Sequence, residues 1–336
     1  MNAFAHLSRR QMLAGAALAS TALAAPGLMV PALERAGAAA PKAGAQEPGF
    51  YRFKVGDFEV TAINDGTWFR KLTPQFVRNA PIAEVQDSLT AGFLPPDALP
   101  VPFTALVVNT GSRVLLFDTG TGAQFGSFAP QSGSFAANLA AAGIDPDSVD
   151  AVYISHFHPD HINGLKTRTN EPTFPNASIN VPDAEWAFWM DDGNMTRAAD
   201  AAEPTFKNAR RVFDSIEYMV EPFGPESTLE SGVTSIPAPG HTPGHTAYVI
   251  NSGNQSLLYV ADTAFHPFVF VRHPEWQIAV DMDGNQAVET RRKIFDLAVA
   301  DRMLTHGYHW SFPGTGHLAR LGDGYDMVPI MWQPTV

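Results

Sequence analysis

The chain has 336 residues, a formal net charge of −12 and no cysteine. The lack of cysteine excludes disulfides and thiolate ligands, so any bound metal must be held by histidine, aspartate or glutamate. The negative charge argues against a surface that follows nucleic-acid phosphates, which requires a basic stripe. With 27 glycines and 27 prolines, the sequence also indicates many loops rather than a helical bundle.

The first 40 residues differ in composition from the rest of the chain. Arg9 and Arg10 come directly before an alanine-rich apolar stretch that runs to about Val30. A positive start, an apolar run and small residues are typical of a secretory signal, and paired arginines indicate the twin-arginine route. A membrane anchor is the alternative, which Pro26 and Gly27 disfavour.

The domain organisation follows from this change in composition. We predict a signal peptide of the twin-arginine type over residues 1–40 and a linker over residues 41–49. Residues 50–336 show no second break in composition and no repeat, which predicts one domain. We therefore expect this domain to be exported to the periplasm or secreted, with no stable membrane anchor after signal cleavage.

Strand patterns come first in the predicted domain. Residues 58–63 alternate between apolar and polar side chains, and Asn64-Asp65-Gly66 then predicts a turn. Residues 103–109 and 113–117 are apolar runs on either side of Thr-Gly-Ser, which predicts a hairpin.

A helix and a buried strand follow. Residues 134–142 have helical spacing of apolar residues, and Gly143 predicts the end of that helix. Residues 149–154 form a short apolar run, which predicts a buried strand. Residues 197–219 predict helix on both sides of Pro204.

The last third alternates strands and helix. Residues 247–250 and 257–260 predict a strand pair, residues 285–300 a helix, and residues 303–305 a strand. Strands, helix and strands again predict sheets with helical cover, which is a layered α/β architecture.

The strongest motif is His156-Phe-His158-Pro-Asp160-His161, directly after the apolar run of residues 149–154. In extended backbone alternate side chains face the same way, so His156, His158 and Asp160 can converge on one point. His161 points elsewhere and can serve a second metal. The pattern therefore predicts a metal centre that could take a second ion.

Three later segments add candidate ligands at strand ends, where α/β scaffolds place their sites. His241 lies in Pro-Gly-His-Thr-Pro-Gly-His, and Asp262 follows an apolar run. Near the C-terminus the candidates are His306, His309 and His317.

In this order the motifs resemble the metallo-β-lactamase superfamily, over most of residues 50–317. The resemblance implies a four-layer αββα sandwich with two divalent metals, zinc being expected and manganese, cobalt or iron the alternatives. It implies that one metal is held by His156, His158 and His241. It implies that the other is held by Asp160, His161 and the late histidine, with Asp262 bridging both.

Three stretches narrow the likeness to the branch that contains methyl parathion hydrolases and secreted lactonases. They are residues 49–67, residues 106–122 and the segment Tyr-His-Trp-Ser-Phe-Pro-Gly at 308–314. The family's last histidine precedes an aromatic Phe-Pro-Gly turn, which favours His309, with His306 and His317 left as alternatives.

Other residues have expected supporting roles. His245 is expected to shape the His241 loop, and Asp118 to tie the loop beneath the site. Phe265, Trp186 and Trp189 are candidates for the substrate pocket, although such aromatic clusters are also common in cores.

These assignments imply a metal-dependent hydrolase. A hydroxide that bridges the metals attacks the substrate, and Asp160 and Asp262 are the catalytic carboxylates, with Asp160 passing a proton to the leaving group. We expect a neutral small-molecule ester, either a lactone or an aryl phosphotriester. Phe265 cannot donate a hydrogen bond, unlike the tyrosine that small quorum-quenching lactonases carry at this point.

Other functions remain open from the sequence. On the same fold they are a β-lactamase, a thioesterase and a mononuclear iron oxygenase, and a zinc-binding module without catalysis is a further class. No nucleic-acid partner is expected, and a homodimer is compatible with the sequence.

Overall fold

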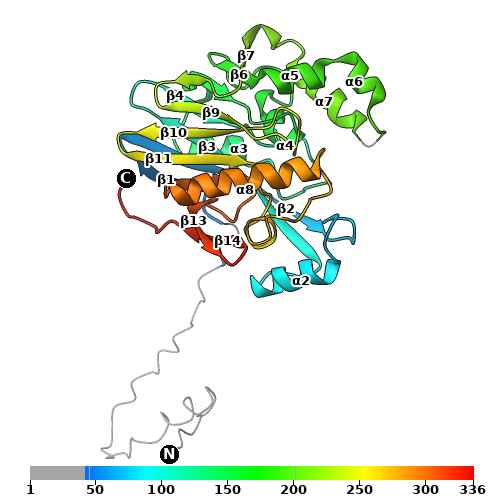
Figure 1. Ribbon diagram of the computed structural model, residues 1–336. Coiled ribbons are helices and arrows are strands. Elements are labelled where there is room, and N and C mark those ends of the chain that lie inside the picture. The colour runs from blue at the N-terminus through cyan, green and yellow to red at the C-terminus, as the bar shows by residue number, and fades with distance from the viewer. Residues whose placement is uncertain (1–41, 45, 201) are drawn as a thin grey trace, which may run out of the picture. The chain divides into compact units, whose positions relative to one another are not determined.

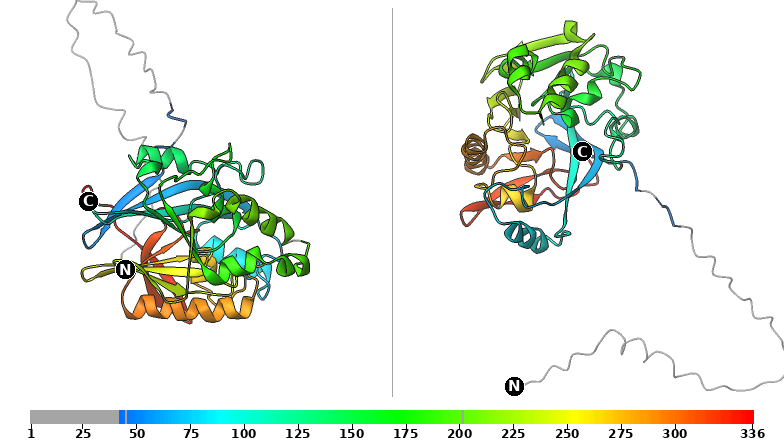
Figure 2. Two further views of the ribbon diagram at one scale, coloured as in Figure 1. Left: turned by 90° about the horizontal axis from the view of Figure 1, so that it is seen from above. Right: turned by 90° about the vertical axis from the view of Figure 1, so that its right-hand side faces the viewer.

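Two seven-stranded β-sheets lie face to face, with helices on their outer faces (Figures 1 and 2). The computed structural model describes residues 42–44, 46–200 and 202–336. The predicted signal peptide of residues 1–40 lies outside the described residues, so its prediction stands on the sequence alone. The layers agree with the αββα sandwich that the resemblance implies.

The first sheet follows the chain, because each strand pairs with the one before it. Its first four strands are antiparallel, and the remaining three continue parallel to the fourth. The strands are β1 (Phe50–Val55), β2 (Phe58–Lys71), β3 (Ala98–Asn109), β4 (Val114–Phe117), β5 (Ala151–Tyr153), β6 (Ser178–Pro182) and β7 (Val220–Phe223).

The second sheet has the order β14-β13-β12-β11-β10-β9-β8. All its neighbouring strands are antiparallel except β11 and β12, which run parallel with helix α8 between them in sequence. The strands are β8 (Thr228–Glu230), β9 (Val233–Pro237), β10 (Thr246–Ser252), β11 (Gln255–Ala261), β12 (Leu304–Gly307), β13 (Thr315–Leu321) and β14 (Gly324–Pro329).

Helices cover both sheets. The α-helices are α2 (Ile82–Ala91), α3 (Phe135–Ala141), α4 (Pro159–Ile162), α5 (Asp183–Met190), α6 (Asp192–Arg197), α7 (Glu203–Phe213) and α8 (Gly284–Ala300). Short turns of other helix types are η1 (Pro146–Ser148), η2 (Asn163–Leu165), η3 (Glu217–Met219) and the π-helix η4 (Pro267–Val271). No helix within the described residues is both long and apolar enough to cross a membrane.

Helix α8 shows why these segments form helices where they do. Asp283 caps its first turn by accepting a hydrogen bond from the Gln286 backbone N–H. Its buried residues Ala287, Arg291, Ile294 and Ala298 recur at steps of three and four, which gives one inward face. Figure 2 shows α8 lying on the outer face of the second sheet, where it contacts β13.

Several predicted elements are confirmed with small changes in their ends. The two predicted hairpins are β3–β4 and β10–β11, and the two predicted helices near residues 134–142 and 285–300 are α3 and α8. The buried strand predicted at 149–154 is β5, whose three residues are all buried, as expected for a strand inside a parallel sheet.

The predicted turn at residues 64–66 is wrong, because β2 continues through it with a β-bulge between Asn64 and Gly66. The Asp65 carboxylate is buried there and accepts hydrogen bonds from the Thr121 N–H, the Thr121 hydroxyl and the Phe135 N–H. The polar triplet is therefore an internal brace rather than a solvent-exposed turn.

Two predictions for the helical region also need correction. Pro204 does not divide a helix, since it lies in the first turn of α7, where its missing N–H costs nothing. Residues 198–200 are not helical. Trp186 and Trp189, the aromatic pocket candidates of this region, lie on helix α5.

Replacing Asp65 tests the brace. Asp65→Ala leaves three buried donors without an acceptor, so we expect it to lower the free energy of unfolding by about 3 kcal/mol. Asp145→Ala is the matched control, because Asp145 is exposed and accepts only the Asp147 N–H. That control should lose about 1 kcal/mol or less. Urea unfolding of both variants measures the difference, and an equal loss of unfolding free energy in the two would show that the Asp65 hydrogen bonds do not stabilise the fold more than an exposed cap does.

Candidate metal centre

The seven predicted ligands lie just beyond four strand ends at one edge of the sandwich. Strand β5 of the first sheet leads into four of them, and β9, β11 and β12 of the second sheet each lead into one. In chain order they are His156, His158, Asp160, His161, His241, Asp262 and His309. The structure therefore brings together residues that are up to about 150 positions apart in the sequence.

One group of donor atoms comes from three histidines and Asp262. His158 Nδ1 lies 2.9 Å from His156 Nε2 and 3.0 Å from His241 Nε2. Asp262 Oδ2 lies 3.2 Å from His241 Nε2 and 3.8 Å from His156 Nε2. Four donor atoms from three separate loops thus surround one point.

A second group comes from α4 and from the segment after β12. Asp160 Oδ2 lies 3.5 Å from His161 Nε2 and 3.4 Å from His309 Nε2. Asp262 also reaches this group, with Oδ1 3.3 Å from His161 Nε2 and Oδ2 3.1 Å from His309 Nε2. Asp262 is thus adjacent to both groups, which is the position a bridging carboxylate needs.

These distances fit metal ions. A tetrahedral zinc ion with bonds of about 2.0–2.1 Å separates its ligand atoms by roughly 3.4 Å. His161 Nε2 and Asp262 Oδ1 are buried and have no hydrogen-bond partner within the described residues. Buried polar atoms are rarely left so, and a cation between the donors would satisfy both. Imidazole and carboxylate donors suit zinc and neighbouring first-row metals.

The imidazoles are held from behind. Four of them have an oxygen partner 2.7–3.0 Å from Nδ1, so that Nε2 is turned toward the centre. For His156, His161, His241 and His309 these partners are the Ser155 hydroxyl, the Asp118 carboxylate, the Asp281 carboxylate and the Pro102 carbonyl.

Asp118 holds the base of the centre, as the sequence predicted for it. Its carboxylate accepts hydrogen bonds from the Ser155 N–H and hydroxyl and from the Tyr259 hydroxyl, and it contacts His161 Nδ1 at 2.7 Å. Asp118 directly follows β4 and Tyr259 lies on β11, so this carboxylate also connects the two sheets.

Charge in the centre is divided unevenly. Burial lowers the pKa of His156 and His158 well below its ordinary value, and neighbouring histidines lower it further, so both rings are neutral. Burial also lowers the pKa of His241, but Asp262 and Asp281 outweigh it and raise the value to about 9. Protons held by such groups must leave when a metal binds.

Glu185 on α5 is a residue of the site that the sequence reasoning missed. It is fully buried. Its Oε1 accepts from the Phe157 N–H at 2.9 Å and from Trp189 Nε1 at 2.6 Å. Its Oε2 accepts from the Thr242 hydroxyl and the Gly244 N–H, both at 2.9 Å. One carboxylate therefore joins the His156–His158 loop to the His241 loop. A lone glutamate among the apolar residues of α5 is the signal that could have revealed it.

The two glycines of Pro-Gly-His-Thr-Pro-Gly-His are required for different physical reasons. Gly240 has a φ of +128°, and a Cβ there would lie 2.3 Å from the Ala287 N atom of α8. Gly244 needs no unusual φ, but a Cβ would lie 2.2 Å from the Glu185 N atom. The loop that carries His241 is thus pressed between two helices.

The other histidines that the structure describes lie outside the two donor groups. His245, between Ala238 O at 3.1 Å and the Asp262 N–H at 3.2 Å, orients the backbone of Asp262, in keeping with its expected supporting role. His306 is buried between Thr104 and Thr315. His317 contacts the Met303 carbonyl. Of the three late candidates, the structure therefore brings His309 to the centre.

A cavity of about 330 Å³ opens over the centre. Its base contains His158, Asp160 and Asp262, and its wall includes Phe265. The other lining residues are Trp68, Arg70, Phe103, Phe125, Phe128, Pro159, Thr205 and Val280. The aromatic wall was not predicted apart from Phe265, because it comes from β2, β3 and the loop after β4.

Trp186 and Trp189 do not line this cavity, contrary to the pocket prediction. Trp186 packs against Phe157 and Phe213, and Trp189 is buried with its Nε1 bonded to Glu185. Both residues therefore support α5 and the histidine loop from the side of the core.

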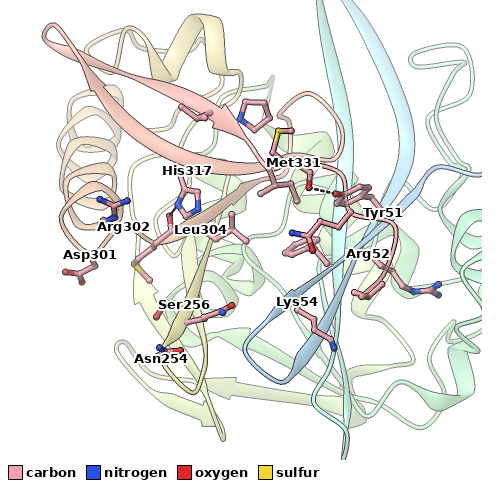
Figure 3. Close-up of a pocket in the computed structure, with 18 of the residues that line it drawn as sticks. Tyr51, Arg52, Lys54, Asn254, Ser256, Asp301, Arg302, Leu304, His317 and Met331 are labelled. Carbon is pink, nitrogen blue, oxygen red and sulfur yellow. Dashed lines mark hydrogen bonds between the residues drawn. The ribbon is translucent and has the colours of Figure 1, made fainter.

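A separate cavity of about 690 Å³ lies between β1 and the C-terminal segment (Figure 3). Figure 3 shows Tyr51 donating a hydrogen bond to the Met331 carbonyl, at 3.1 Å, across one side of it. His317 lines this cavity and none of the seven predicted ligands does. The C-terminal histidine therefore faces a different part of the protein.

Replacing Glu185 tests its role in holding the centre. In Glu185→Gln an amide N–H replaces one acceptor, so two of the four donors lose their partner, and we expect 10- to 100-fold weaker zinc binding. Glu84→Gln is the matched control, because Glu84 also lies in the first turn of a helix but is exposed. Competition with a chelator measures both affinities. Equal affinities in the two variants would contradict the role of Glu185.

Comparison with known proteins places this geometry in a family. Residues 100–306 match the family model of the metallo-β-lactamase superfamily. Probable metallo-hydrolases of Mycobacterium tuberculosis and Mycobacterium bovis are each 25% identical over 192 residues, which is 48% of this chain and 56% of theirs. The chain thus spans just over half the length of these curated relatives.

Solved structures agree. The hydrolase AbOPH, described as belonging to the β-lactamase superfamily, has a TM-score of 0.79 and 28% identity, over 86% of this chain and 100% of its own. The dizinc quorum-quenching lactonase AidC has a TM-score of 0.78 and 27% identity, over 85% and 98%. A probable metal-dependent hydrolase from Staphylococcus aureus, 18% identical over 84% and 100%, shares the fold with a TM-score of 0.70. Since the family model covers more than half of the sequence, the chain belongs to the metallo-β-lactamase superfamily.

Proposed function

We propose that the protein is a hydrolase with two divalent cations, expected to be zinc, that cleaves neutral esters such as lactones and aryl phosphotriesters. The observation that carries the proposal is the pair of donor groups joined by Asp262 at the base of an aromatic cavity. The similarity to AidC, whose structure holds N-hexanoyl-L-homoserine as a product, supports a lactone.

The residues divide into two ligand sets that share one carboxylate. His156, His158 and His241 would hold one cation, and Asp160, His161 and His309 the other, with Asp262 between them. When bound, two such cations lower the pKa of a shared water toward ~7 and stabilise negative charge that develops on a substrate oxygen.

Asp160 is the better placed of the two carboxylates to move a proton. Both carboxylates line the cavity, but the Asp160 side chain is 15% exposed, whereas that of Asp262 is 2% exposed. A carboxylate open to the cavity can take a proton from water and deliver it to a leaving oxygen. Asp262 is enclosed by His156, His161, His241 and His309, and therefore serves to hold the ligand sets together.

Phe265 favours substrates with good leaving groups. Its ring centroid lies 4.1 Å from that of His309, so it forms the wall directly beside the centre. A phenyl ring offers no hydrogen bond to a carbonyl or phosphoryl oxygen. Stabilisation of the negative charge on that oxygen then depends on the positive charge of the cations. This charge alone is enough for hydrolysis most readily when the substrate has a good leaving group.

Metal analysis of variants tests the ligand sets. We expect two zinc ions per chain, and Asp262→Ala should lower both the zinc content and the turnover. His309→Ala should lose one ion, whereas His317→Ala, the matched control, should keep both. A content near one ion per wild-type chain in excess zinc would contradict the proposal, and one iron per chain would favour an oxygenase. Unchanged turnover in Asp262→Ala would exclude its bridging role.

A substrate panel tests the reaction. We expect the highest kcat/KM for an aryl phosphotriester or for a γ-, δ- or N-acyl-homoserine lactone, because the cavity wall is mainly aromatic and the chain is acidic. The comparison compounds are a chromogenic β-lactam and a glutathione thioester. If either exceeds the esters by more than tenfold, which is about 1.4 kcal/mol of transition-state preference, the ester assignment is wrong.

A further inference from the structure

Arg70 is the one lysine or arginine that lines the cavity over the metal centre, among the described residues. It lies on β2 two positions after Trp68, so both side chains face the same side of the sheet. The bulge at Asn64–Gly66 adds one residue to β2, and such an insertion decides which alternate residues beyond it face inward.

Two aromatic rings fix the Arg70 guanidinium. Its central carbon lies 5.0 Å from the ring centre of Trp68 and 4.9 Å from that of Phe76. Phe76 is buried and comes from the loop after β2, so the clamp is closed from two directions. A side chain held in this way loses little further freedom when it binds a ligand.

Comparison with the other stacked arginines shows what is unusual about Arg70. Within the described residues, five arginines stack on aromatic rings, and four of them also have a carboxylate oxygen within 4.0 Å. Those four pairs are Arg52–Glu59, Arg272–Asp326, Arg291–Asp281 and Arg320–Asp296. Among the residues that the structure describes, Arg70 has no carboxylate partner, and its side chain makes no hydrogen bond to any of them.

The stacked rings do not satisfy the hydrogen-bonding capacity of Arg70. A guanidinium has five N–H donors in a planar fork, which matches the two oxygens of a carboxylate or the lone pairs of a carbonyl. Partial burial lowers the pKa of Arg70, which reflects desolvation of the charge, but an arginine in a protein stays protonated. A charged, partly desolvated donor without a protein acceptor is poised to bind an acceptor on a ligand.

We propose that Arg70 binds an oxygen acceptor on the non-reacting part of the substrate, which narrows the neutral esters and lactones to those with a second carbonyl; a carboxylate in place of that carbonyl is the alternative that the experiment below distinguishes. This rests on the proposed function, because it takes the centre as the place where the scissile bond lies. The substrate is then fixed at two points of one cavity, at the centre and at Arg70. The aromatic wall contacts the chain between them.

Binding of ring-opened compounds tests this assignment apart from catalysis. The probes are N-hexanoyl-L-homoserine, which has an amide carbonyl, 4-hydroxydecanedioate, which has a second carboxylate, and 4-hydroxydecanoate, which has neither. All three contain a 4-hydroxybutanoate unit, which carries its side chain at C2 in N-hexanoyl-L-homoserine and at C4 in the other two compounds. Calorimetry on zinc-loaded protein should show at least fivefold tighter binding of one or both of the first two compounds.

Arg70→Met keeps a long side chain between the two rings but removes the donors. We expect this variant to lose about tenfold in affinity for the preferred compound, while its affinity for 4-hydroxydecanoate changes less than twofold. Arg70→Lys should retain part of the preference, because it keeps the charge without the fork. Arg272→Met is the matched control, since Arg272 also stacks on an aromatic ring, that of Phe268, but lies outside the cavity. We expect this variant to leave the affinities for all three compounds unchanged.

Each outcome has a definite meaning. A selective loss for the amide compound or for the dicarboxylate supports the assignment and identifies the acceptor. An equal loss for all three compounds, no loss for any, or no preference in the wild-type protein overturns it. The same holds if none of the compounds binds at millimolar concentration. Failure of the ester panel with a selective loss in Arg70→Met would instead overturn the reaction and leave the acceptor site in place.

Discussion

The structure depends on holding the imidazole nitrogens and carboxylate oxygens of the metal centre closer together than these atoms would stay without support. His158 Nδ1 has two imidazole nitrogens within 3.0 Å, and the Asp262 carboxylate has four histidines around it. Imidazole nitrogens that face each other in this way cannot all be satisfied by one another's protons. The arrangement can exist only if rigid elements fix each ring, and the four strand ends of the two sheets supply that rigidity.

Buried carboxylates do most of the fixing. Glu185 accepts four hydrogen bonds and joins two histidine loops, and Asp118 joins β4, β11 and the loop after β5. A carboxylate has about four lone-pair sites on two oxygens, more than any other side chain offers. Burial raises the pKa of Glu185 above its ordinary value and its four donors lower it only in part, so the hydrogen bonds offset part of the cost of burying the charge.

On the side of the second sheet, Arg291 of α8 plays the corresponding part. It donates to the carbonyls of Thr263, Pro274 and Trp276 and lies 3.7 Å from Asp281, the partner of His241. Burial lowers the pKa of Arg291 to about 10, against the attraction of Asp281, so it remains charged near neutral pH. One helix thus steadies both the residue that follows Asp262 and the carboxylate behind His241.

The features that could be predicted from the sequence are those whose residues lie close together within one short segment. His156, His158, Asp160 and His161 occur together after an apolar run, and the Phe-Pro-Gly turn after His309 marks the late histidine. Glu185 could not be found in this way, because its four donors come from three segments that meet only in the fold. For the same reason, Asn64-Asp65-Gly66 resembled a turn: the partners of Asp65 lie 56 and 70 residues away.

The cavity itself shows why local pattern reading stops at the ligands. Its wall joins Trp68 of β2, Phe103 of β3, Phe125 and Phe128 of the next loop, and Phe265 beyond β11, which no single segment contains. The first four of these rings pack on each other in a row, with Trp68 and Phe128 centred 4.4 Å apart, so this part of the wall is a continuous apolar surface. Charges act more strongly across such a surface than in water, because little solvent screens them. This wall leaves only a few polar groups open to the cavity, at the metal centre and at Arg70. These groups therefore decide the orientation of a bound ligand.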